Sequence, residues 1–96
     1  MAEIGNRLVY RVHAVERMQQ RGISDAEVRT VLLEGKEIER YPRGLPYPSR
    51  LMHGWIGARP IHVVVADNSA DNEAIVVTVY EADPNEWEPG FERRKA

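Results

Sequence analysis

The stretch RVHAVERMQQRGISDAEVRTVLLEG, residues 11–35, decides the fold. Its apolar residues recur every three to four positions in two runs, roughly 12–21 and 25–34, which predicts two amphipathic helices. Gly22 follows the first run, and glycine commonly ends a helix because it adopts a left-handed conformation without a Cβ clash. The turn between the helices is therefore very short, and we expect them to pack as a corner or hairpin.

The second helix has the clearest local signature in the chain. Ser24 is a typical N-cap residue, and Glu27 stands three positions later, which predicts a capping box. Ile23 and Val28 flank this box at the spacing of a hydrophobic staple. We therefore expect a securely terminated helix that supports its neighbour.

Downstream, alternating or continuous apolar runs predict four strands, at residues 36–41, 49–56, 59–67 and 74–81. Three prolines within residues 42–48 predict a loop there. The chain then reads as one α+β domain, with a helix pair at 11–35, a sheet at 36–81 and a tail at 82–96. A sheet whose strands are apolar on both faces must be covered on both faces. We expect the helices to cover one face. A partner, or the tail through Trp87 and Phe91, would cover the other.

Composition excludes several classes of protein. The 96 residues suit a single domain, and the lack of cysteine excludes disulfides and thiolate zinc sites. The first ten residues do not resemble a signal peptide, and no apolar run spans a membrane, so we expect a cytoplasmic protein. The net charge of −2 argues against a dedicated nucleic-acid coat protein. Residues 1–60 are nevertheless basic, with ten Lys and Arg against seven Asp and Glu.

The first helix carries His13, Arg17 and Arg21, spaced four apart. Four residues advance a helix by about 400°, so these side chains form one slanted stripe beside the apolar face. Two guanidiniums suit a phosphodiester, and a neutral imidazole can act as a general base. Metal-free RNA cleavage is one interpretation of the stripe. A solvated polar face is the other, and the spacing alone favours it.

The strands offer further candidates. Arg50, His53 and His62 fall on neighbouring strands, and Tyr80 lies on the last one. A histidine among valines is more often a core residue that forms a hydrogen bond with the backbone, and we favour this interpretation for His53 and His62. Of these two histidines, His62 is the better functional candidate. The chain has no HExxH motif or His-x-His pair, so we expect no metal site. A DNA-binding helix-turn-helix is a further alternative, but its second helix would be acidic.

Several segments together resemble a known family: HAVERMQQRGIS, YPSRLMHGWIGARPIHVVVA, VVTVYEADPNEW and the closing FERRK. The chain resembles the DUF4258 family of small bacterial proteins from about residue 13 to residue 95. The resemblance implies an α+β fold in which two N-terminal helices pack on a small antiparallel β-sheet of about four strands, as in the RelE/ParE toxin superfamily.

The resemblance also implies a function, namely the toxin component of a toxin–antitoxin system that acts as a RelE-like, metal-free RNA endonuclease. The expected partners are RNA and a cognate antitoxin of the zinc-finger or DNA-binding type, and no cofactor is expected. A non-catalytic protein- or RNA-binding module on the same scaffold is the alternative. The candidate catalytic residues are His13, Arg17, Arg21, His62 and Tyr80, and the candidate RNA-binding residues are Arg50, Arg93 and Arg94.

Overall fold

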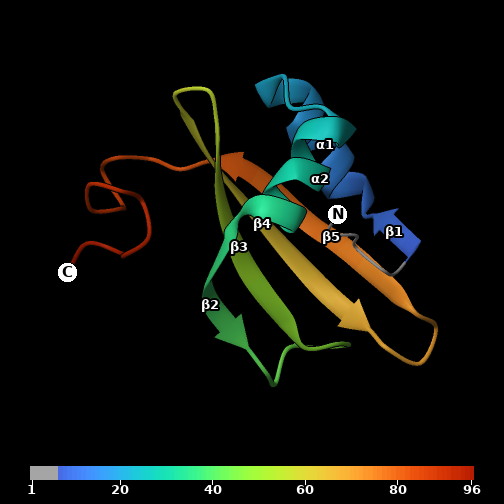
Figure 1. The fold of residues 1–96 in the computed structure, drawn as a ribbon. Helices are drawn as coiled ribbons and strands as arrows, with labels where there is room; N and C mark the ends of the chain where they lie inside the picture. Colours follow the sequence, from blue (N-terminus) through green and yellow to red (C-terminus); the bar gives the residue numbers. More distant parts are fainter. Residues whose placement is uncertain (1–6) are drawn as a thin grey trace.

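The computed structural model describes residues 7–96, and Figure 1 shows their arrangement. Residues 1–6 lie outside the described residues. They belong to the N-terminal stretch for which the sequence predicts no signal peptide. Both helices have the predicted bounds. The elements in chain order are β1 (Arg7–Tyr10), α1 (Val12–Arg21), α2 (Asp25–Glu34), β2 (Lys36–Tyr41), β3 (Ser49–Ile56), β4 (Arg59–Asn68) and β5 (Glu73–Glu81).

The sheet differs from the predicted one. It has five strands in the order β1-β5-β4-β3-β2, and it is mixed, because β1 runs parallel to β5 while the other neighbours are antiparallel. The expectation of a four-stranded antiparallel, RelE/ParE-like sheet is therefore wrong. The physical reason is that β1 has only four residues and pairs with a strand more than sixty positions away. No local pattern reports such a pairing.

The two helices cover one face of the sheet (Figure 1). α1 contacts β5, and α2 contacts β3 and β4. The side chains between the helices and the sheet form the larger hydrophobic core of the described residues. This core contains Ala14, Ile23, Val28, Val31, Met52, Ile61, Val63, Val65, Ala74, Val76 and Val79.

The turn and caps of the helix pair match the local signals. Gly22 has φ 64° and donates its N–H to the carbonyl of Met18. The Ser24 hydroxyl accepts from the Glu27 N–H at 3.1 Å, and the Glu27 carboxylate accepts from the Ser24 N–H at 2.9 Å. The predicted capping box is therefore confirmed. At the other end of α2, a Cβ on Gly35 would lie 2.3 Å from the Val31 carbonyl oxygen and 2.5 Å from that of His53 on β3, so only glycine permits this close junction with β3.

The C-terminal segment, residues 82–96, covers the opposite face of the sheet. Trp87 is 3 % exposed and packs with Leu51 and Ala82 in a second core, which Tyr80 and Phe91 flank. Figure 1 shows this segment, in red, leaving β5 and folding back beside the sheet. The expected second cover is thus the chain's own tail. This segment shields from water the face of the sheet on which His53 and His62 lie.

Candidate functional site

The stripe on α1 lies on the outside of the molecule. His13 and Arg21 are exposed, and Arg17 is half-buried. Within the described residues, neither Arg17 nor Arg21 forms an ion pair. Arg11, the N-cap residue, is exposed and also lacks such a pair in this range. Glu16 is the one acidic residue of the helix.

The arginines of α1 differ in this respect from most of the other cations in the described residues. Within residues 7–96, seven of the 13 Lys and Arg residues form ion pairs with carboxylates. None of the seven lies on α1. They are Arg7, Arg29, Lys36, Arg40, Arg50, Arg59 and Arg94.

Arg59 extends the cationic surface at the C-terminal end of α1. Its Nη2 atom donates to the carbonyl of Arg21 at 2.6 Å, and its Nη1 atom donates to that of Gly22 at 3.4 Å. A guanidinium at a helix C-terminus satisfies carbonyls that have no partner within the helix. Its Nε atom also pairs with Glu81 at 3.0 Å. Sequence reasoning missed Arg59, because its partners on the helix lie nearly forty positions away and leave no local signal.

His62 and Tyr80 lie on the other face of the sheet, beneath the C-terminal segment. His62 is fully buried, with Nε2 at 2.9 Å from the carbonyl oxygen of Phe91 and Nδ1 at 3.2 Å from the Tyr80 hydroxyl. A carbonyl can only accept, so Nε2 carries the proton and Nδ1 accepts from Tyr80. Burial lowers the pKa of His62 to about 4 and raises that of Tyr80 to about 12. Both side chains are therefore neutral at pH 7.

The five candidate catalytic residues do not meet in one cleft. His13, Arg17 and Arg21 stand on α1, which covers the sheet on one side. His62 and Tyr80 belong to the second core on the other side, with the C-terminal segment over them. Because the sheet separates the two groups, a single substrate cannot contact both at once in this conformation.

The candidate RNA-binding residues are also dispersed. Arg50 forms two hydrogen bonds with Asp67, at 3.2 and 3.4 Å. Arg94 binds Glu39 at 2.7 and 3.1 Å, and its guanidinium lies 4.6 Å from the centre of the Trp87 ring. The hydrogen bonds from Arg94 lower the pKa of Glu39. Arg93 is exposed and forms no ion pair within the described residues.

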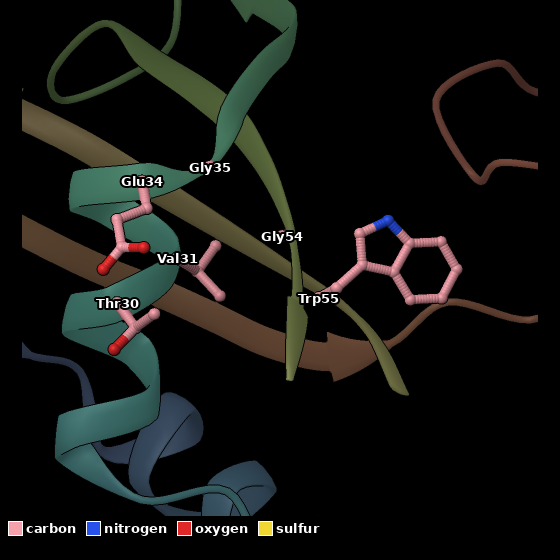
Figure 2. A pocket seen from close by; sticks show the side chains of 6 residues that line it. All are labelled: Thr30, Val31, Glu34, Gly35, Gly54 and Trp55. Atoms are coloured by element: carbon pink, nitrogen blue, oxygen red, sulfur yellow. The ribbon is translucent and has the colours of Figure 1, made fainter. Parts of the chain in front are cut away.

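A depression of about 160 Å³ lies between the C-terminal half of α2 and the end of β3 (Figure 2). Thr30 and Glu34 extend from α2 at its rim, while the Trp55 indole points away from the helix (Figure 2). The Thr30 hydroxyl donates to the carbonyl of Ala26 and is therefore already satisfied. The depression does not bring together a set of polar groups that could hold a reacting molecule.

In residues 7–96, no three His, Cys, Asp or Glu side chains lie close enough together to hold a metal ion. No helix in the same range is long and apolar enough to cross a membrane.

Comparison with known proteins identifies a family but no detailed counterpart. Neither the curated proteins nor the solved structures contain a match to the chain. A family model, described as a domain of unknown function (DUF4258), matches residues 10–81. The match begins at the end of β1 and runs to the end of β5, so it includes both helices and four of the strands. Because it covers well over half of the chain, this protein belongs to the DUF4258 family.

Proposed function

We propose that this protein is a non-catalytic RNA-binding module that holds the phosphate backbone of RNA against α1. One observation carries the proposal. Arg17 and Arg21 on α1, and Arg11 at its N-cap, have no ion-pair partner among the described residues, whereas most other cations in this range are paired with carboxylates. An exposed cationic helix with a single acidic residue attracts phosphates through local charge, even in a protein whose net charge is −2.

The expected contacts follow from side-chain chemistry. Arg17 and Arg21 lie about one helical turn apart, and each planar guanidinium can bind two oxygens of one phosphate. His13 adds a hydrogen-bond donor or acceptor one turn earlier. The separation of this stripe from His62 and Tyr80 supports binding without catalysis. Because few phosphates are contacted, we expect modest affinity that falls with salt.

A titration of RNA against salt tests this proposal. Fluorescence anisotropy with a short unstructured RNA should show binding to the wild type at low salt. The double variant Arg17→Gln/Arg21→Gln should bind at least about tenfold more weakly, because two phosphate contacts are lost. Its slope of log K against log salt should be shallower by about 1.4, the value for two phosphates on a single strand.

Arg43→Gln is the matched control. Arg43 is exposed and, within the described residues, also has no ion-pair partner, but it lies in the loop between β2 and β3. Its substitution should leave RNA affinity close to that of the wild type. The proposal is wrong if the wild type has no salt-dependent affinity for RNA, or if Arg43→Gln weakens binding as much as the double variant.

Metal-free RNA cleavage, as in a toxin of a toxin–antitoxin pair, is the second candidate function. The exposure of His13 one turn from Arg17 favours it, because an accessible imidazole beside a guanidinium can take a proton from a 2′-hydroxyl. This candidate predicts RNA products with 2′,3′-cyclic phosphate ends and growth arrest on expression. His13→Ala combined with Arg17→Ala should abolish both, and intact RNA after incubation with the wild type would eliminate it.

The two candidates imply different partners. Binding alone requires only RNA, whereas a toxin also requires a cognate antitoxin protein that keeps the cell alive. Both place the protein in the cytoplasm, where RNA is available and a chain without cysteine needs no oxidising environment.

A further inference from the structure

The C-terminal segment has almost all of its backbone hydrogen bonds within itself. The N–H groups of Glu86 and Trp87 donate to Asp83, Phe91 donates to Glu88, and a bridge joins Trp87 to Arg94. Further bonds run from Glu88 to Arg93 and from Lys95 to Glu86. Only its first residue, Ala82, donates a backbone N–H to a strand of the sheet, at Pro60. The segment can therefore leave the sheet as a folded loop without losing its internal bonds.

Side chains attach this loop to the sheet. Trp87 inserts into the second core, and its ring centre lies 4.5 Å from that of His62. The Phe91 carbonyl accepts from His62, Arg94 binds Glu39 on β2, and Glu92 binds Lys36 at 2.8 Å. The two ion pairs are partly exposed, so water can replace them at small cost.

The face beneath the segment is unusual for a core. His53 is 3 % exposed, and neither of its ring nitrogens has a hydrogen-bond partner. It lies against the His62 ring at 5.1 Å between centres. Buried polar atoms without partners destabilise the covered state, and release of the segment would let water reach them.

The match to the family model ends at Glu81, where β5 ends. The C-terminal segment therefore lies beyond what this chain shares with the family model, although the face that it covers is built by matched strands. We infer that residues 82–96 act as a detachable strap that closes a face formed by His53, His62 and Tyr80. Release exposes two imidazoles and a phenol together, on the side of the sheet opposite the stripe proposed to bind RNA.

Detachment changes the chemistry of His62. In the closed state, burial holds its pKa far below that of a free imidazole, and its two nitrogens are occupied by Phe91 and Tyr80. Opening removes the burial and the bond to Phe91. The ring then titrates near neutral pH and can donate or accept a proton, as a solvated histidine does.

Chemical modification of the histidines in the intact protein tests this inference. The exposed His13 serves as the internal reference for a fully accessible imidazole. Diethyl pyrocarbonate modifies accessible neutral imidazoles, so exposed His13 should react quickly while His53 and His62 react slowly. Arg94→Ala removes a charged hydrogen-bonded pair and the stacking on Trp87, so it should accelerate modification of His53 and His62 by about tenfold. Peptide mapping by mass spectrometry gives the rate at each histidine.

Arg93→Ala is the matched control, because Arg93 is the exposed neighbour of Arg94 and its side chain has no ion pair within the described residues. It should react as the wild type does. Glu39→Gln removes the charge of the same pair from the strand side but leaves Arg94 stacked on Trp87, so it should accelerate the modification by less than Arg94→Ala does. Amide hydrogen exchange of β4 should stay unchanged in every variant. Wild-type modification rates in Arg94→Ala and Glu39→Gln, or β4 amides that exchange faster together with the histidines, would overturn the inference.

Discussion

His62 is the residue whose ionisation should affect stability most clearly. Its pKa is about 4 in the folded protein, below the value near 6.5 of a free imidazole, so the unfolded chain binds more protons between these pH values. Stability therefore rises with pH across this interval and is lost as the pH falls from about 6.5 towards 4. Burial also lowers the pKa of His53, which adds to the trend in the same direction.

We predict that the free energy of unfolding falls by about 2 kcal/mol between pH 7.5 and 5 because of His62 alone. The groups that face His62 are Tyr80, His53, Arg94 and Glu39. Glu39 has a lowered pKa and remains charged throughout this range. Urea unfolding at several pH values measures the effect. His62→Gln keeps a donor for Phe91 and does not titrate, so its stability should vary less with pH, and an unchanged pH dependence would refute the assignment.

At the scale of the element, α2 depends on its N-terminus. The reciprocal bonds between Ser24 and Glu27 satisfy two backbone N–H groups that have no partner within the helix. Asp25 in the first turn accepts from the Tyr10 hydroxyl at 2.5 Å, which ties the helix start to the end of β1, and from Arg29 of the same helix at 2.9 Å. The cap thus satisfies the start of α2, and the bond from Tyr10 holds that start beside β1.

We predict that Ser24→Ala lowers the free energy of unfolding by about 1 kcal/mol, the usual cost of removing a serine N-cap. Ser69→Ala is the control, because Ser69 is exposed in the turn between β4 and β5 and caps no helix. Chemical denaturation monitored by circular dichroism compares the two. Equal stability of Ser24→Ala and the wild type would show that the capping box contributes nothing to α2.

At the scale of the whole molecule, the sheet carries two covers of different construction. The helix pair is buried against β3, β4 and β5 through a broad apolar core. The C-terminal segment has no helix or strand and is attached mainly by Trp87 and a few polar contacts. The two tryptophans make this difference measurable, because Trp87 is 3 % exposed and Trp55 is 50 % exposed.

We predict that Trp87→Ala lowers the free energy of unfolding by up to about 3 kcal/mol, a loss limited to the free energy with which the C-terminal segment docks. Trp55→Ala should lower it by less than about 1 kcal/mol, because that indole is already half in water. Thermal denaturation of both variants, with far-ultraviolet circular dichroism to confirm that the helices remain, checks this. Similar losses for the two variants would mean that Trp87 does not anchor the segment.

The sequence by itself determined the helix pair and most of the sheet. The bounds of α1 and α2, the glycine turn and the capping box depend on contacts within four residues, which a local pattern records directly. The runs that form β2, β3, β4 and β5 were visible as alternating or continuous apolar segments. The need for a second cover over the sheet also followed from those runs.

Only the tertiary structure decided how these parts meet. β1 joins β5 in parallel, Arg59 reaches the end of α1, and His62 bonds to Phe91, each across tens of residues. It also decided that the stripe of His13, Arg17 and Arg21 lies on one side of the sheet and His62 and Tyr80 on the other. The physical reason is that helix caps and apolar periodicity are local, whereas strand pairing, burial and charge neutralisation depend on which distant segments come into contact.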